Sequence, residues 1–192
     1  MSHDISAEVP DDRNRLVIPP SERDYRQGEL HARVVLVEYG DYQCPDCREL
    51  YTLIKTIQEQ PDATFLEKTD LCFVFRQFPQ PQIHSQAQKV ALAALAAGAQ
   101  GQFWQMHEML FSHQQELGNG YLVEYADRIE LDIPRFLQDI TRQVQVDRID
   151  QDIESGIQSG VTVAPALYIN GTRYIDRWDM EQLVTAIVTA SH

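Results

Sequence analysis

Apolar residues follow two spacings along the chain, one typical of strands and one typical of helices. The valine-rich run at residues 33–39 predicts a buried strand. Residues 45–59 carry apolar side chains at positions 50, 54 and 57, which lie on one helix face, and this helix is expected to end at Pro61. A second strand is expected at Leu71–Phe75. These segments have the length of a βαβ unit, so the strands should be parallel and joined by a right-handed crossover.

A helical pattern occupies the centre of the chain, residues 84–160. Its first apolar stripe is rich in alanine and is expected to end at Gly98, whereas Asp132, two residues before Pro134, predicts the start of the fourth helix. The apolar stripes that predict these four helices cover residues 87–97, 103–111, 122–129 and 137–144.

The last part of the chain returns to strands. Residues 166–169 and 172–175 are separated by Asn170-Gly171, the dipeptide most typical of a two-residue hairpin turn. Apolar positions spaced over residues 180–188 then predict a closing amphipathic helix. The element order is therefore β-α-β, a helical block and β-β-α.

The segment before the first strand, residues 1–29, is polar and contains three prolines. We expect an irregular arm with at most a short edge strand at Leu16–Ile18. No basic region followed by an apolar stretch opens the chain, so we expect no secretory signal and a cytoplasmic location. The longest apolar stretch, Val90–Ala97, is far too short to span a bilayer, so we expect a soluble protein without a membrane partner.

Composition narrows the class of protein further. The 192 residues, 43% of them apolar, can bury a core without disulfide support. The formal charge of −13, from 16 basic against 29 acidic residues, argues against nucleic acid or anionic lipid as a partner. Three cysteines are too few for a disulfide framework. In a reducing cytosol, a close cysteine pair is more often catalytic or metal-binding than structural.

Such a pair, Cys44-Pro45-Asp46-Cys47, lies where the first predicted strand gives way to the first predicted helix. Two thiols on the first turn of a helix can close a small disulfide ring. The helix N-terminus favours a thiolate, the form that attacks disulfides, because it carries partial positive charge and unpaired N–H groups. Pro45 suits this turn because its missing N–H is not needed there. The pattern predicts a thiol–disulfide oxidoreductase in which Cys44 attacks and Cys47 resolves.

Zinc binding is the main alternative for the cysteine pair. Tetrahedral zinc needs four ligands, and the other candidates show no paired spacing, so no metal is expected. Cys72, in the middle of a predicted strand, is expected to be a buried and inert thiol. The helical residues His84, Trp104 and His107 are expected to pack or cap helices. The candidates considered as further zinc ligands are Cys72, His84, His107 and His113.

Six short motifs follow one another along the chain: residues 37–47, residues 75–79, His84, residues 100–107, residues 159–161 and residues 169–171. In this order they resemble the DsbA-like family of thiol–disulfide oxidoreductases, and the resemblance runs from about Gly28 to Ile187. The resemblance implies a thioredoxin fold with a helical insertion. Residues 30–83 and 161–192 would form the thioredoxin-like domain and residues 84–160 the insertion.

The resemblance also implies roles for the residues around the pair. Cys44 matches the family's exposed nucleophile and Cys47 its buried partner. Pro165 matches the cis-proline of the loop that faces the disulfide and pairs with substrate backbone, and Glu38 matches an acidic residue linked to proton movement. No cofactor is implied beyond the redox-active disulfide. The candidate substrate-binding residues are Pro45, Asp46, Ala164 and Pro165.

The residues by themselves leave two of these roles open. Most X–Pro bonds are trans, so Pro165 alone would be an ordinary loop proline. Glu38 either points outward at a sheet edge or shares a face with Val34 and Leu36, because side chains alternate along a strand. Among apolar neighbours its carboxyl would have a raised pKa and could exchange a proton with Cys47.

The predicted cis-proline loop departs from the family pattern Gly-Thr-Pro-Thr. Here it reads Val163-Ala164-Pro165-Ala166, so both hydroxyls and their hydrogen bonds are missing. The backbone pairing surface is expected to persist, because a residue before proline stays extended whatever its side chain.

Asp46 places a negative charge beside the attacking sulfur. At about 6 Å and an effective dielectric constant of roughly 20–80, it raises the Cys44 pKa by roughly 0.5–2 units. Asp41 would add to this if it lies nearby. We therefore expect a pair less oxidising than strongly oxidising relatives, and a reducing or isomerising role on protein thiols and disulfides. Glutathione or a thioredoxin-type protein is the expected electron donor.

Two other classes of protein fit the same scaffold. A glutathione-dependent transferase or isomerase would bind glutathione at the Pro165 loop and keep its activity without Cys47. A redox-inactive protein-binding domain would keep its binding without either cysteine.

Overall fold

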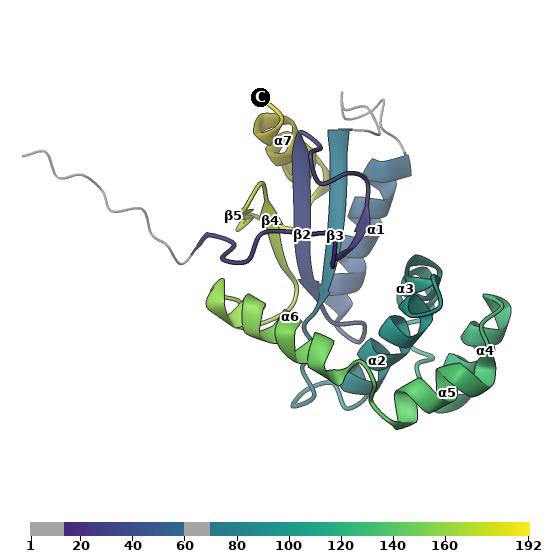
Figure 1. The fold of residues 1–192 in the computed structure, drawn as a ribbon. Coiled ribbons are helices and arrows are strands. Elements are labelled where there is room, and N and C mark those ends of the chain that lie inside the picture. The colour runs from purple at the N-terminus through teal and green to yellow at the C-terminus, as the bar shows by residue number, and fades with distance from the viewer. Residues whose placement is uncertain (1–13, 60–69) are drawn as a thin grey trace, which may run out of the picture.

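The computed structural model describes residues 14–59 and 70–192, and these form a five-stranded sheet with helices on both faces (Figure 1). The strand order is β1-β3-β2-β4-β5. The elements in chain order are β1 (Tyr25–Gln27), β2 (Val34–Gly40), α1 (Pro45–Glu59), β3 (Leu71–Gln77), α2 (Ala87–Gly98), α3 (Phe103–Ser112), α4 (Asn119–Arg128), α5 (Ile133–Thr141), α6 (Val146–Gln158), β4 (Ala166–Ile169), β5 (Thr172–Arg173) and α7 (Met180–Ala190).

The βαβ unit predicted from the sequence is confirmed. β2 and β3 are parallel and pair from Val34 opposite Leu71 to Gly40 opposite Gln77. α1 covers the predicted residues and buries the side chains at positions 47, 50, 54 and 57. Pro61, expected to end this helix, lies outside the described residues.

The C-terminal hairpin also follows the prediction. β4 pairs with β2 on one side and with β5 on the other, antiparallel in both cases. Asn170 and Gly171 have φ values of 47° and 78°, as the two central residues of a type I′ turn require. β5 is shorter than expected and ends at Arg173, and α7 closes the chain.

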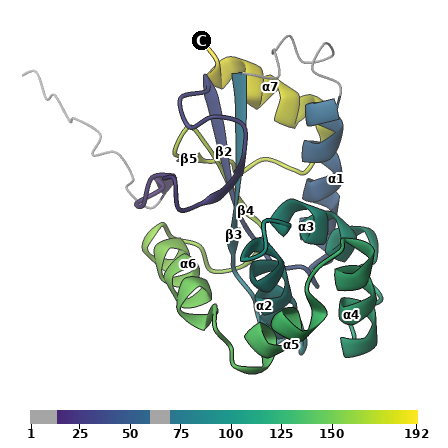
Figure 2. The ribbon, with the colours of Figure 1, turned by 45° about the vertical axis from the view of Figure 1, so that its right-hand side comes forward.

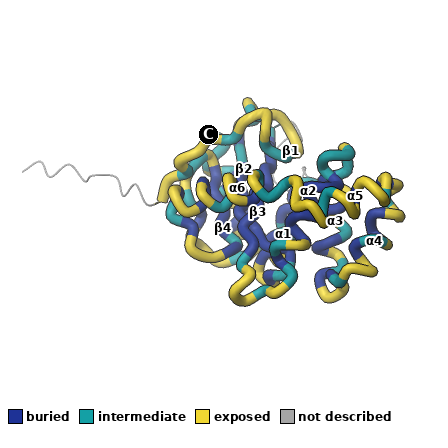
Figure 3. The backbone as a smooth tube through the Cα atoms, turned by 60° about the horizontal axis from the view of Figure 1, so that its bottom comes forward, coloured by how far each residue is buried: buried dark blue, intermediate teal, exposed yellow. Residues whose placement is uncertain are grey.

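Helices α2–α5, here called the helical block, lie to one side of the sheet (Figure 1). α2 is buried over most of its length and forms the centre of the block, as expected of a helix that is apolar on almost every face. The buried residues accordingly gather along the central strands and α2 (Figure 3). α5 begins after Asp132, whose carboxylate accepts a hydrogen bond from the Arg135 amide, as the capping signal predicted.

The fourth predicted helix is wrong at its end. α5 stops at Thr141, and a separate helix, α6, follows where the sequence analysis recognised none. The break falls at Gln143, whose φ of 50° is usually signalled in a sequence by glycine or asparagine. α6 covers the face of the sheet opposite to α1 (Figure 2). There the Ser155 hydroxyl lies 2.9 Å from the Tyr39 hydroxyl.

The described part of the N-terminal arm also differs from the prediction. No strand forms at Leu16–Ile18; β1 lies later, at Tyr25–Gln27, and pairs antiparallel with β3. Directly before the predicted position there is only an isolated bridge between Arg15 and Thr172, and the carbonyl groups of Ile18 and Pro19 accept hydrogen bonds from the Arg76 guanidinium. Residues 1–13 of the arm lie outside the described residues. In the described part of the chain, no helix is long and apolar enough to cross a membrane.

Candidate active site

The predicted cysteine pair lies at the N-terminus of α1, beside the end of β2. Cys44 directly precedes the helix, and its carbonyl accepts the Arg48 amide at 3.2 Å. The Cys47 amide donates to the Cys44 sulfur at 3.4 Å, and all described cysteines are free thiols. Pro45 and Asp46 between them are exposed, whereas Cys44 is 6% and Cys47 0% exposed. The pair therefore combines a slightly exposed Cys44, more buried than the resemblance implied, with a fully buried Cys47 on the same helical turn.

The surroundings favour the thiolate of Cys44. The hydrogen bond from the Cys47 thiol lowers the pKa of Cys44 to about 7, and the backbone amides of Cys47 and Asp46 act in the same direction. Burial and the negative charge of Asp46 oppose this change. The predicted direction of the Asp46 effect is confirmed, although the helix terminus and Cys47 outweigh it.

The surroundings of Cys47 favour its protonated thiol instead. Burial raises its pKa well above the ordinary value, and the charges of Glu38 and Cys44 raise it further. The Asp41 amide lies 3.4 Å from its sulfur and opposes the change. At neutral pH the pair therefore combines a sulfur that readily ionises with a neighbour that keeps its proton.

Glu38 lies inside the protein and is coupled electrostatically to both cysteines. Its side chain is 0% exposed, and both carboxyl oxygens lack a hydrogen-bond partner among the described residues. Burial raises its pKa well above 4.5, and the charge of Cys44 acts in the same direction. The alternative of an outward carboxylate at a sheet edge is therefore wrong, because β2 is a central strand.

The loop before β4 faces the cysteine pair. The Ala164–Pro165 peptide bond is cis, and the Cys44 thiol donates to the Ala164 carbonyl at 3.5 Å. Ala164 is buried and Pro165 half-buried, whereas Val163 is 50% exposed. The loop thus brings its backbone to the more accessible of the two sulfurs.

Gln114, which the sequence analysis did not single out, and Asp41, which it considered only as a nearby charge, hold this arrangement. Gln114, which follows α3, donates its amide hydrogens to the carbonyl groups of Tyr42 and Cys44 at 2.9 and 2.7 Å. The Asp41 carboxylate is buried and accepts hydrogen bonds from the Gln43 amide at 2.8 Å and from the loop after β3. It is thus directed toward that loop, and no local signal in the sequence marks these contacts.

His107 and Trp104 have the packing roles expected of them, whereas His84 lies in the loop before α2 and not in a helix. His107 contacts the Tyr42 hydroxyl at 3.0 Å and lies among aromatic rings, and burial lowers its pKa to about 3. Trp104 donates its indole N–H to the Arg26 carbonyl and so ties α3 to β1. His84 lies 2.8 Å from the Asp41 carboxylate at the start of the helical block.

The remaining candidates for reactive chemistry are Cys72 and any group of side chains that could bind a metal ion. Cys72 is 0% exposed in β3, and burial raises its pKa to about 11, as an inert thiol requires. Within residues 14–59 and 70–192, no three His, Cys, Asp or Glu side chains gather closely enough to hold a metal ion.

Comparison with solved structures shows where this fold occurs. Oxidised BdbD from Bacillus subtilis superposes with a TM-score of 0.79 at 21% identity and covers 93% of this chain and 98% of that chain. The thiol-disulfide exchange protein alpha-DsbA2 from Wolbachia pipientis superposes with a TM-score of 0.68 at 21% identity, covering 85% of each chain. These likenesses confirm the predicted thioredoxin fold.

Curated relatives give closer sequence matches over a smaller part of their length. Na(+)/H(+) antiporter NhaA 3 of Salinispora tropica is 34% identical over 176 residues, which is 91% of this chain and 26% of the antiporter. Na(+)/H(+) antiporter NhaA 1 of Mycolicibacterium gilvum is 34% identical over 168 residues, again 26% of that protein. The chain spans about a quarter of these relatives. The family model described as thioredoxin matches residues 21–188, so the chain belongs to the thioredoxin family.

Proposed function

We propose that this chain is a thiol–disulfide oxidoreductase that exchanges disulfides with protein substrates through Cys44 and Cys47. The observation that carries the proposal is the opposite tuning of two sulfurs on one helical turn. The pKa of Cys44 is lowered to about 7 and that of Cys47 is raised, so only Cys44 is ready to attack at neutral pH.

The reaction follows from this difference. The Cys44 thiolate attacks one sulfur of a substrate disulfide and forms a mixed disulfide, while the other substrate sulfur leaves as a thiolate. Cys47 then loses its proton and attacks the Cys44 sulfur, which releases the second substrate thiolate. Two electrons pass to the substrate and the Cys44–Cys47 disulfide is formed. A dithiol, glutathione or a thioredoxin-type protein returns the two electrons.

Glu38 is proposed to take the proton of Cys47 in the second step. Its carboxyl is coupled electrostatically to Cys47, and among the described residues it has no hydrogen-bond partner that would favour one charge state. A raised pKa brings such a group closer to working pH, where a general base is most effective.

The substrate is proposed to bind as extended backbone along Ala164 and Pro165. The residue before a proline favours extended φ and ψ whatever its side chain, so the missing hydroxyls of this loop leave the backbone surface intact. Pro45 and Asp46 are exposed beside Cys44 and would contact the same substrate.

The direction is proposed to be reducing or isomerising, in the cytoplasm. A Cys44 pKa of about 7 supports this, since strongly oxidising pairs have a thiolate with a pKa of about 3.5. A less stabilised thiolate means a less oxidising disulfide. Nothing in the Cys44–Cys47 geometry bears on the ion exchange named for the antiporter relatives.

The reduction potential of Cys44–Cys47 in glutathione buffers, read by mass after trapping of free thiols, tests the proposal. We expect a value near or below about −230 mV. A value near about −120 mV would overturn the reducing direction. If no disulfide forms between the two cysteines, the proposed function itself fails.

Two variants separate the rival classes in a disulfide-reductase assay with a protein substrate. Cys44→Ser should abolish turnover, and Cys47→Ser should trap the mixed disulfide. Full activity of Cys47→Ser with glutathione would instead favour a transferase or isomerase. Unchanged partner binding without turnover in any variant would favour a binding domain.

A further inference from the structure

Five residues around the cysteine pair form a closed circuit of hydrogen bonds. Cys47 N donates to Cys44 Sγ at 3.4 Å, and Cys44 Sγ to Ala164 O at 3.5 Å. Ala164 N donates to Gln80 Oε1 at 3.0 Å, and Gln80 N to Asp41 Oδ2 at 2.9 Å. Asp41 N closes the circuit at Cys47 Sγ, at 3.4 Å. The circuit joins the ends of β2 and β3, the start of α1 and the loop before β4.

Gln80 provides the link to the loop before β4 that the loop's own side chains cannot supply. Val163 and Ala164 have no side-chain hydrogen-bonding groups. Ala164 is 4% exposed, so its N–H would be buried without a partner if Gln80 were absent. A buried, unpartnered amide is unfavourable enough to move a loop, and here the loop carries the carbonyl that contacts Cys44.

Gln80 is itself held in place. The Asp41 carboxylate that accepts the Gln80 amide is 0% exposed and also accepts from His84 Nδ1 and from the Gln43 amide. Gln80 accepts the amides of Ile83 and His84 at its own carbonyl, at 3.1 and 2.9 Å. Its side chain therefore reaches Ala164 from a fixed backbone.

We propose that Gln80 is a positioning residue that sets the distance between the Ala164–Pro165 backbone and the Cys44 sulfur. It thereby controls both the access to Cys44 and the alignment of bound substrate. This inference rests on the proposed disulfide exchange and adds a specific determinant to it. Gln80 takes over, from another segment, the anchoring that a loop hydroxyl could provide.

The test compares Gln80→Leu, which removes the acceptor, with Gln80→Glu, which keeps an oxygen at the same position. Gln82→Leu is the matched control, because Gln82 is exposed in the same loop. The rate of alkylation by iodoacetamide is followed against pH for each cysteine by peptide mass. The plateau at high pH reports access to Cys44, the midpoint reports its pKa, and labelling of Cys72 reports unfolding.

For Gln80→Leu we expect a several-fold higher alkylation plateau at Cys44 and unchanged Cys72 labelling. The kcat/KM for a protein disulfide should fall about tenfold, mostly through KM, as expected for one lost buried hydrogen bond. Gln80→Glu should keep the wild-type plateau, although its charge raises the midpoint. Gln82→Leu should match wild type throughout.

The inference is overturned if Gln80→Leu matches Gln82→Leu, or if Gln80→Glu gains the same raised plateau as Gln80→Leu. If Gln80→Leu labels Cys72 and so does not fold, Gln80→Asn serves instead, because its shorter amide cannot reach Ala164. Wild-type turnover measured alongside separates the outcomes. If wild type is inactive the proposed function fails, whereas the alkylation plateau still tests the position of the loop.

Discussion

Buried carboxyl groups lie on both faces of the β2–β3 pair, and the two faces differ in whether these groups have hydrogen-bonding or charged partners. On the face toward α1, Glu38 has no hydrogen-bond partner among the described residues. On the face toward α6, Asp24 and Asp152 are almost as deeply buried and are paired with arginines. The comparison separates a carboxyl group without a hydrogen-bond partner among the described residues from carboxyl groups that are paired with arginines.

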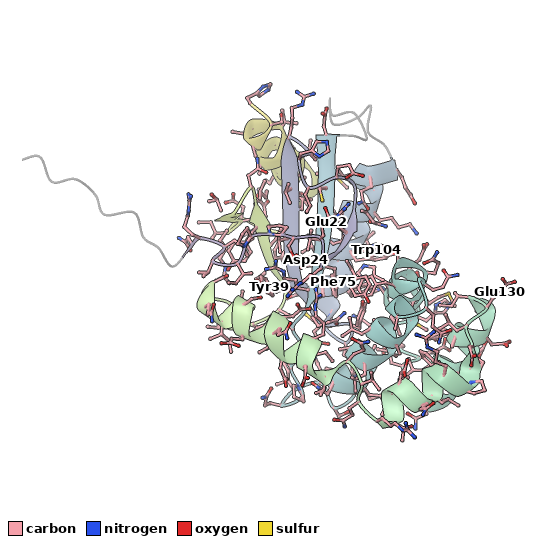
Figure 4. All side chains as sticks on the ribbon, in the orientation of Figure 1. Glu22, Asp24, Tyr39, Phe75, Trp104 and Glu130 are labelled. Carbon is pink, nitrogen blue, oxygen red and sulfur yellow. The ribbon has the colours of Figure 1, made fainter. Side chains whose placement is uncertain are left out.

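The paired group, here called the charge cluster, consists of Asp24, Arg76, Arg148 and Asp152. Arg76 and Asp24 are 3% and 5% exposed and meet at 2.9 Å, where the N-terminal arm crosses the strands near Tyr39 (Figure 4). Arg148 contacts Asp152 at 3.1 Å and Asp24 at 3.5 Å. Asp152 also accepts the Gln77 amide at 2.9 Å.

The two sites differ in the interactions that counteract the effect of burial on the pKa of the carboxyl group. Burial is the largest cause that raises the pKa of Asp152, and Asp24 acts in the same direction; Arg148, the Gln77 amide and Arg76 lower it, and the resulting pKa is about 6. For Glu38, burial and Cys44 both raise the pKa. The charge cluster thus joins the arm and α6 to the sheet, whereas Glu38 has no arginine partner among the described residues.

The largest effect is expected from breaking the charge cluster. Arg76→Met leaves Asp24 buried with only Arg148 beside it, so the free energy of unfolding should fall by about 3 kcal/mol. Urea denaturation measures this, and Arg128→Ala, in an exposed pair, should lower it by about 0.5 kcal/mol or less. The double variant Asp24→Asn/Arg76→Met should recover part of the loss. Because the charge cluster and Cys44 lie on opposite faces of the sheet, Arg76→Met should leave the pH midpoint of Cys44 alkylation unchanged. A shifted midpoint would contradict this expectation.

A smaller effect of opposite sign is expected at Glu38. Its folded-state pKa is raised, so the unfolded chain ionises first and wild type loses stability as pH rises from about 4 toward the folded pKa. Glu38→Gln does not titrate and should be more stable than wild type by about 1–3 kcal/mol at pH 7. Unfolding curves at pH 3.5 and 7 measure the difference, which should nearly vanish at the lower pH.

The same variant tests the proton transfer. Glu38→Gln should slow the attack of Cys47 on the mixed disulfide, so that this intermediate accumulates in rapid-quench experiments. A more stable protein with an unchanged second step would show that the carboxyl is not the base.

The smallest effect is expected at Asp46, at the surface. Its charge raises the pKa of Cys44, so Asp46→Asn should lower the alkylation midpoint by about 0.5–1 unit below the wild-type value. Asp46→His should lower it further at pH values where the imidazole is charged. An unchanged midpoint would mean that solvent screens Asp46 completely.

The local parts of this design were predictable from the sequence. The position of Cys44 and Cys47 on the first turn of α1 follows from a valine-rich run that precedes an apolar stripe of helical spacing. The Asn170-Gly171 turn follows from two residues that tolerate positive φ. Alternation along β2 gave an apolar face as one of two alternatives for Glu38, and the central place of β2 in the sheet decides between them. The first two of these features depend only on residues near one another in the chain.

The polar contacts around the site were not predictable in this way. Gln80 and Asp41 are 39 residues apart, Gln114 and Cys44 are 70 apart, and Gln80 and Ala164 are 84 apart. A glutamine in a polar loop looks the same whether or not it reaches such a partner. The strand β1 was not predicted for a similar reason. It forms by pairing with β3, which lies about fifty residues later in the chain.

The two hydrogen bonds from Gln114 to the carbonyl groups of Tyr42 and Cys44 limit the sequence changes that this site can accept. Both hydrogen bonds go to the main chain, so the side chains between the two cysteines can be exchanged without disturbing them. The length of the loop from Tyr42 to Cys44, in contrast, cannot change without breaking these hydrogen bonds. One residue more or fewer would move both carbonyl groups away from the Gln114 side chain, which is itself buried. Natural or engineered diversity at this site should therefore arise by substitution and not by insertion or deletion. A shortened protein without the helical block would have to find new partners for both groups.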